Sequence, residues 1–179
     1  PVFINFGSGL GTGNLPIPGR KYFEYMPYCD GLCTTGSYPV NALGESKALF
    51  NKARAMRYLV KFDRTREKPL AQWIGLSYIG AERRKPNPTS RGPKPEEVRA
   101  QIWMCIVEGA TGIGFFPHSW STPDKPSVRN YTQFRVDEPV KKEVKRITEQ
   151  IKELTPVILS PNSTKKVKVT NLEETDVDI

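Results

Sequence analysis

The segment from Pro95 to Trp120 constrains the fold of this chain more than any other. Proline at a first helical position and two glutamates behind it indicate the start of a helix. Residues 98–107 are apolar on nearly every side, so we expect a helix that is enclosed by protein and ends at Gly109. Residues 111–116 then have the character of a buried strand, and a polar and aromatic loop follows. This order is the repeating unit of α/β proteins, whose ligands bind at the carboxyl ends of strands.

The same unit recurs along the chain. Short apolar runs predict parallel strands at residues 2–6, 29–40, 70–79 and 111–116. Apolar residues at helical spacing predict helices at residues 46–62, from Pro95 to Gly109, and from Asp137 to about Pro156. The first of these helices has Ser46 as a candidate N-cap. After the strand at 111–116 we expect a long irregular loop that reaches Val136.

Four strand-to-helix units that run in one direction form half of a (β/α)8 TIM barrel, although an open α/β sheet is also compatible. A complete barrel takes about 250 residues, and this chain has 179. We therefore predict an α/β fold in which residues 1–160 form the second half of a barrel. Because the chain opens on a strand-like segment without Met, we expect the missing first half to belong to a longer polypeptide and to be its partner. Residues 161–179, with the alternating segment KKVKVT, are expected to begin a C-terminal β element or a linker.

The chain is basic, with 27 Lys and Arg against 19 Asp and Glu and a net charge of +8. Its basic residues are spread over the expected helices, which is typical of solvated helix faces and not of a nucleic-acid site. They include Lys52, Arg54, Arg57, Lys61, Lys141, Lys142, Lys145, Arg146 and Lys152. We expect no nucleic-acid partner.

The composition also argues against a membrane span, a metal site and a nucleotide cofactor. No apolar stretch approaches the roughly 18 residues that a spanning helix needs. Cys29 and Cys33 have no companion Cys or His pair, and Cys105 lies in an apolar helix, where a buried thiol is expected. The glycine-rich residues 7–14 fit neither phosphate-binding pattern. We therefore expect no metal and no cofactor.

Polar and aromatic side chains gather where the predicted strands end. A carbohydrate cleft needs flat rings that stack on the C–H faces of sugars, together with donors and acceptors that orient the hydroxyl groups. We predict that five residues bind a carbohydrate substrate in this way: Asn5, Tyr38, Trp73, His118 and Trp120. For Trp73, packing between a strand and a helix is an equal alternative.

Glycoside hydrolysis requires two carboxylates. The candidates near the expected strand ends are Asp30, Glu82 and Asp124. Structural roles are open to each of them, because Asp30 could cap a loop and Glu82 could pair with a neighbouring arginine. Asp30 and Glu82 are the best available carboxylates, and we predict them as the catalytic residues. A Ser-His-Asp arrangement with Ser119 and His118 is discounted, because adjacent side chains of a strand point to opposite sides.

Several segments of the chain resemble a known family. They are PVFINFG, CDG…SYPV, KPLAQWIG, RKPNPTSRGPKPEEVRAQIWMCIVEGATGIGFF and ITEQIKELTPVI. These segments look like the carboxyl-terminal half of (β/α)8-barrel glycoside hydrolases and glycosidase-like proteins of bacterial secreted type, over about residues 1–160. The resemblance implies hydrolysis of O-glycosidic bonds in a polysaccharide or oligosaccharide, and an extracellular or periplasmic location.

The resemblance also implies where the catalytic carboxylates lie. In retaining enzymes of this group, the acid/base follows the fourth strand and the nucleophile follows the seventh. If residues 111–116 are the eighth strand, KPLAQWIG is the seventh, and the acid/base belongs to the missing half. The chain has Ile74, Gly75 and Leu76 at the nucleophile position, and Glu82 is the nearest carboxylate. Two functions therefore stay open: a glycoside hydrolase, or an inactive barrel that binds carbohydrate or serves as a structural subunit.

Overall fold

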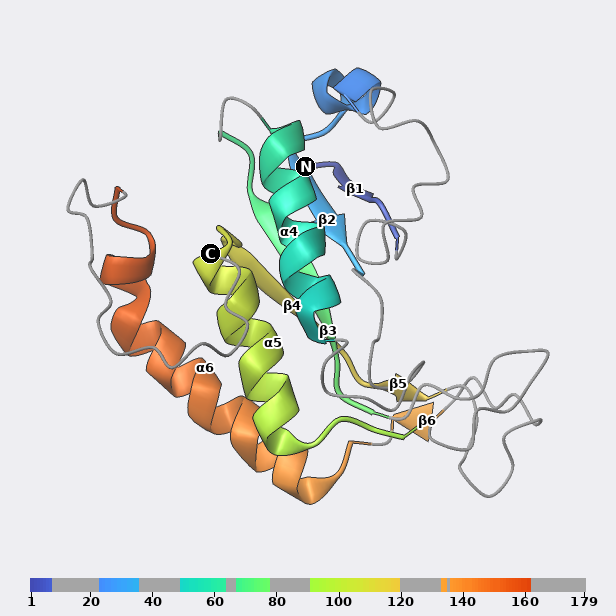
Figure 1. Ribbon diagram of the computed structural model, residues 1–179, viewed down its shortest axis with the longest axis vertical. Helices are drawn as coiled ribbons and strands as arrows, with labels where there is room; N and C mark the ends of the chain where they lie inside the picture. The colour runs from blue at the N-terminus through green and yellow to red at the C-terminus, as the bar shows by residue number, and fades with distance from the viewer. Residues whose placement is uncertain are drawn as a thin grey trace, which may run out of the picture.

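The structure, a computed structural model, describes residues 1–7, 23–35, 49–63, 67–77, 91–119, 133–134 and 136–161. These residues form an α/β fold with a four-stranded parallel sheet (Figure 1). The strands are β1 (Phe3–Asn5), β2 (Gly31–Thr34), β3 (Leu70–Gly75) and β4 (Gly112–Phe116), and they lie in the order β1-β2-β3-β4. The predicted α/β class and the parallel sheet are confirmed, with strands shorter than expected.

Three α-helices accompany the sheet in the described residues: α4 (Phe50–Phe62), α5 (Pro95–Val107) and α6 (Glu138–Ile158). A short 3-10 helix, η1 (Phe23–Tyr28), precedes β2. Figure 1 shows α4 and α5 against one face of the sheet, with α6 packed on α5. Right-handed crossovers between successive parallel strands place their helices on the same side. The strand order has no reversal of the kind that defines a doubly wound sheet.

Both ends of α5 follow from local sequence. Pro95 is its first residue, and the carboxylate of Glu97 accepts hydrogen bonds from the backbone N–H of Lys94 at 2.7 Å and from the guanidinium of Arg91 at 2.6 and 2.8 Å. At the other end Gly109 has φ +100°, and its N–H donates to the carbonyl of Ile106. The predicted start and the glycine stop are confirmed.

The expectation that α5 is enclosed on all sides is wrong for its last turn. Val98, Ile102 and Cys105 are fully buried, which confirms the prediction of a buried thiol at Cys105. Val107, however, is 81% exposed. The sheet covers one side of α5 and the helices α4 and α6 flank it, so the described elements leave the fourth side uncovered.

The last helix is longer than the sequence indicated. It starts at Glu138 behind Asp137 as predicted, but it runs through Pro156 to Ile158. A proline inside a helix removes one N–H donor and leaves the carbonyl four residues earlier without its usual partner. Both Pro156 and Lys152 are exposed, so water can bind that carbonyl and the helix continues.

The remaining elements differ in smaller ways. The segment expected as an irregular loop contains two short antiparallel strands, β5 (His118–Ser119) and β6 (Gln133–Phe134). Ser46 and residues 162–179, with the predicted C-terminal β element, lie outside the described residues. None of the helices in the described part combines the length and apolar content that crossing a bilayer requires.

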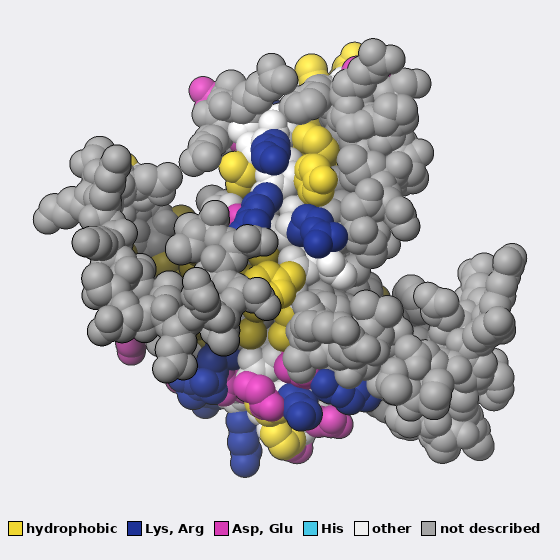
Figure 2. Space-filling model, viewed as in Figure 1, with side chains coloured by type: hydrophobic (Ala, Val, Ile, Leu, Met, Phe, Trp, Pro, Cys, Tyr) yellow, Lys and Arg dark blue, Asp and Glu magenta, His cyan; other side chains and the backbone are white. Residues whose placement is uncertain are grey.

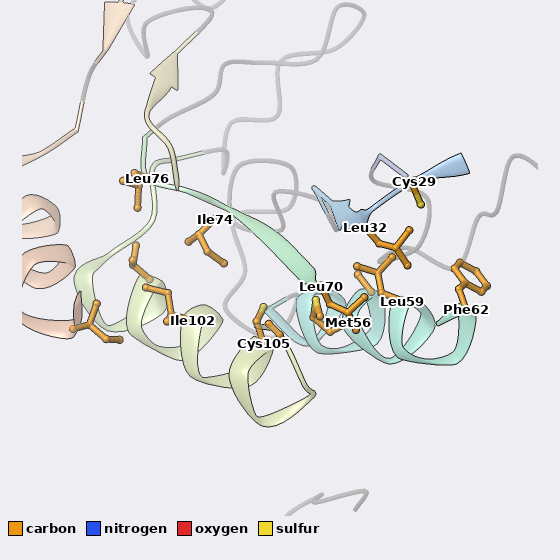
Figure 3. Packing of buried hydrophobic residues seen from close by; sticks show 14 of the residues in the cluster. Cys29, Leu32, Met56, Leu59, Phe62, Leu70, Ile74, Leu76, Ile102 and Cys105 are labelled. Carbon is orange, nitrogen blue, oxygen red and sulfur yellow. The ribbon is translucent and has the colours of Figure 1, made fainter. Parts of the chain in front are cut away.

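The core fills the space between the sheet and its helices (Figure 3). Because successive side chains of a strand point to opposite faces, alternate residues of β2 and β3 face the helices. The main contributors are Leu32, Leu70, Ile74, Met56, Leu59, Phe62, Ile102 and Cys105. Each large apolar side chain buried there stabilises the fold by about 1.5–3 kcal/mol.

Candidate carbohydrate-binding site

The opposite face of the sheet holds the other alternating residues. We call it the distal face and define it by Asn5, Cys33, Trp73, Gly114 and Phe116. In the parallel register Asn5 pairs with Cys33, and Trp73 pairs with Gly114. The neighbours of Trp73 in β3, Gln72 and Ile74, are buried on the helix side. Trp73 therefore does not pack between its strand and a helix.

The indole of Trp73 is half-buried against Gly114 of the next strand. A Cβ atom at Gly114 would lie 2.7 Å from Cε3 of the ring, so the glycine leaves the space that the indole fills. On the other side, burial raises the pKa of the Cys33 thiol, and a side-chain hydrogen bond with Trp73 lowers it by a smaller amount. The ring thus lies against β4 on the distal face, over the space that Gly114 leaves.

Asn5 is the last residue of β1 and has an exposed side chain. Its Oδ1 accepts a hydrogen bond from the N–H of Gly7 at 3.0 Å, which turns the chain at the strand end. Asn5 and Trp73 lie two strands and two residues apart on the same face, which places their Cα atoms about 12 Å from each other. That separation suits two contacts along an extended ligand.

His118 follows β4 at the carboxyl edge of the sheet. Its ring meets that of Phe116 edge to face, with centroids 6.0 Å apart and an interplanar angle of 78°. The hydroxyl of Ser77 donates to the carbonyls of Pro117 and His118 at 3.1 and 3.0 Å, so the segments after β3 and β4 are joined. Asn5, Trp73 and His118 therefore lie on the distal face or at its carboxyl edge. The strand register does not bring Asn5 and His118 together, because they are three strands and six residues apart, which is about 24 Å.

Asp30 lies at the opposite, amino edge of the sheet. Its Oδ2 accepts a hydrogen bond from the N–H of Val2 at 2.6 Å, and its own N–H donates to the carbonyl of Val2 at 2.8 Å. The length of β2, about 13 Å, separates Asp30 from the carboxyl edge. The structure does not bring Asp30 together with Trp73 and His118. Its contacts with Val2 tie β1 to β2, which is a structural role different from the loop cap given as the alternative.

The other predicted site residues, Tyr38, Glu82 and Trp120, lie outside the described residues. The six described strands contain no Asp or Glu. Within the described ranges no group of three His, Cys, Asp or Glu side chains could hold a metal ion. The described part of the site therefore offers aromatic and hydrogen-bonding groups, and no catalytic carboxylate.

The prediction that Lys52 belongs to a solvated helix face is wrong. Its side chain has no exposed surface, and its Nζ donates to the carbonyls of Thr35 at 2.5 Å and Trp73 at 2.7 Å. Burial lowers the pKa of Lys52 to about 7. Lys52 stands at helical spacing before Met56 and Leu59, so its place on the buried face was visible in the sequence. The other basic residues of α4, Arg54, Arg57 and Lys61, are exposed as expected, and Figure 2 shows basic side chains along this helix.

No protein-family model matches this chain, and no curated protein or solved structure is similar to it. A functional assignment depends on the geometry and chemistry of the residues described above.

Proposed function

We propose that this chain binds carbohydrate along the distal face and carboxyl edge of its sheet, as the second half of a (β/α)8 barrel of the glycoside hydrolase type. The observation that carries the proposal is the half-buried indole of Trp73 on the distal face, with Asn5 and His118 along the same side. The flat ring would stack on the C–H face of a sugar. The amide and the imidazole would donate to or accept from its hydroxyl groups.

The barrel is supported by the sequential strand order and by helices that lie on the same face of the sheet. Parallel sheets are almost always covered on both faces. In a closed barrel the distal face becomes the interior, which is filled by side chains and so meets this requirement, and ligands bind only at the carboxyl ends of the strands. Asn5 is the last residue of β1 and Trp73 stands two residues before the end of β3, so both lie near that end. Closure takes eight strands, and the main described sheet has four. The other four would come from the first half of the barrel, which we propose as the partner of this chain.

The first experiment measures oligosaccharide binding by calorimetry, with oligosaccharides of glucose, xylose and mannose as probes. Trp73→Ala should weaken binding of the preferred sugar about tenfold or more, which corresponds to about 1.4 kcal/mol or more. Trp103→Phe is the matched control, because Trp103 belongs to α5 and packs against the core. Equal affinity of the wild type and a folded Trp73→Ala variant would remove Trp73 from the site.

Hydrolysis is the second candidate function, and it is the activity that the resemblance of the sequence segments implies. It needs two carboxylates about 5–10 Å apart, and Asp30 is engaged at the wrong edge. Of the two carboxylates predicted in this chain, Glu82 is then the one left for catalysis, and the other would come from the first half of the barrel. We propose this activity together with an extracellular or periplasmic location.

The second experiment follows the release of reducing ends from polysaccharides by the full-length protein. If the chain hydrolyses glycans, Glu82→Gln should lower turnover at least a hundredfold, while Asp30→Asn should leave it within about twofold. Asparagine keeps an oxygen that can accept from Val2, so Asp30→Asn tests the charge and spares the contact. Loss of turnover in a folded Asp30→Asn variant would contradict its structural role. Binding without any product from the wild type would favour the inactive, carbohydrate-binding barrel.

A further inference from the structure

Lys52 is a fully buried cationic side chain at the border between α4 and the sheet. It lies in the first turn of α4, and no part of it reaches solvent. Transfer of a charged or polar amine out of water is costly unless its N–H groups find acceptors. Among the described residues, Lys52 donates to the backbone carbonyls of Thr35 and Trp73.

These two carbonyls stand where the ladder between β2 and β3 ends. The last paired residues are Thr34 and Gln72, while β3 continues through Trp73 to Gly75. Within the residues that the structure describes, no backbone N–H past Thr34 pairs with β3, and a buried carbonyl without a donor is destabilising. The ammonium of Lys52 joins the carbonyl just past β2 to the carbonyl of Trp73, and so extends the connection between the strands by one side chain.

We propose that Lys52 is a positioning residue that fixes the backbone of β3 at Trp73, and with it the placement of the indole on the distal face. The inference rests on the proposed carbohydrate function only where it concerns sugar affinity. The backbone at Trp73 is held from the helix side by Lys52, while the ring lies against Gly114 on the distal side. Without the ammonium, the end of β2 and the middle of β3 lose their shared contact, and the indole loses one of its supports.

The surroundings of Lys52 contain other buried polar groups. The hydroxyl of Thr34 donates to the carbonyl of Gly7 at 2.6 Å. The amide of Gln72 is fully buried and makes no hydrogen bond within the described residues. In the described residues, the end of β2 and the middle of β3 are linked on the helix side by the hydrogen bonds from Lys52 to Thr35 and Trp73.

The test uses protein labelled with 5-fluorotryptophan, in which the fluorine resonance of Trp73 is assigned by its loss in Trp73→Phe. Lys52→Met keeps most of the side-chain volume and removes the donors. It should shift or broaden the Trp73 resonance and leave that of Trp103 in place. Lys52→Gln keeps an N–H₂ group on a side chain one bond shorter. Lys52→Gln should therefore change the Trp73 resonance less than Lys52→Met does. It is the variant to measure if Lys52→Met does not fold.

Met56→Ala is the matched control for stability. Met56 is buried on the same helix one turn later, and Met56→Ala should destabilise the fold by leaving a cavity. It should nevertheless leave the Trp73 resonance unchanged under conditions in which the protein is folded. An unchanged Trp73 resonance in a folded Lys52 variant, or an equal change in Met56→Ala, would overturn the inference.

Sugar affinity separates this inference from the proposed function. If both hold, Lys52→Met weakens binding of the preferred oligosaccharide about tenfold, and Met56→Ala leaves it within about twofold. If the Trp73 resonance moves but the wild type binds none of the oligosaccharides, positioning by Lys52 stands and the proposed function fails. If the wild type binds and a folded Lys52→Met variant binds equally well with the resonance unmoved, the proposed function stands and the inference fails.

Discussion

The fit of Trp73 against Gly114 predicts a specific effect of one added methyl group. In Gly114→Ala the new Cβ would lie 2.7, 3.0 and 3.1 Å from three atoms of the indole. Carbon atoms are in favourable contact at about 3.5–4.0 Å. The ring must therefore move by roughly 0.8 Å or more. Gly112, two residues earlier on the same strand and face, is the matched control, because a Cβ there would meet Ala71 at an ordinary 3.4 Å.

The magnitude follows from two opposing effects. Overpacking costs about 1–3 kcal/mol, and we expect about 1–2 kcal/mol because the half-buried ring can tilt away from the sheet. Replacing glycine by alanine within a strand recovers about 0.5–1 kcal/mol of chain entropy in both variants. Gly112→Ala should thus be neutral or slightly stabilising. Gly114→Ala should have a free energy of unfolding about 1–2 kcal/mol below that of Gly112→Ala.

The assay is equilibrium unfolding in urea followed by circular dichroism, together with the fluorine resonance of Trp73. We expect a displaced Trp73 resonance and weaker oligosaccharide binding in Gly114→Ala, and neither in Gly112→Ala. The reasoning is refuted if the two variants are equally stable and both keep the wild-type Trp73 resonance. That result would mean that the indole is not seated on Gly114.

Two further predictions concern charged groups. Hydrogen bonds from Arg146 and Arg99 hold the pKa of Glu143 at about 2, below its unfolded value of about 4.3. The stability that ionised Glu143 gives to the fold is therefore fully present above pH 4.3, and it is lost as the pH falls through 2. Because both arginines are about half exposed, Glu143→Gln should lower the unfolding free energy by only about 1–2 kcal/mol at pH 6, and urea unfolding near pH 2 should show no difference from the wild type. Lys52 has a folded pKa of about 7, below its unfolded value, so the unfolded chain binds more protons above pH 7 and stability should rise with pH by up to about 1.4 kcal/mol per unit. This rise in stability should stop near pH 8.5–9, where cysteine in the unfolded chain loses its proton. Burial raises the pKa of Cys105 to about 12 in the folded chain, so this titration lowers stability as the pH rises. A Lys52→Met variant whose stability rises with pH as steeply as that of the wild type would contradict this prediction.

Short-range patterns in the sequence determined most of the elements. Pro95 with its following glutamates and Gly109 at the far end delimit α5, because capping depends on residues within one turn of the helix. The alternation of short apolar runs and helical periodicity was sufficient for a parallel α/β sheet. Pro156 shows the limit of such rules, since an exposed helix end can tolerate a missing donor.

The tertiary structure alone decided the roles of individual side chains. The sequence already placed Asp30 near the start of its predicted strand, but only the pairing of β1 with β2 showed that its carboxylate accepts from Val2. The pairing of β3 with β4 seats Trp73 on Gly114. The helical spacing of Lys52 with Met56 and Leu59 placed it on the buried face, but only the folded chain showed which carbonyls its amine meets there. The physical reason is that spacing along the chain sets which face a residue occupies. Its partners come from strands and helices that are distant in sequence, and only the folded chain brings them together.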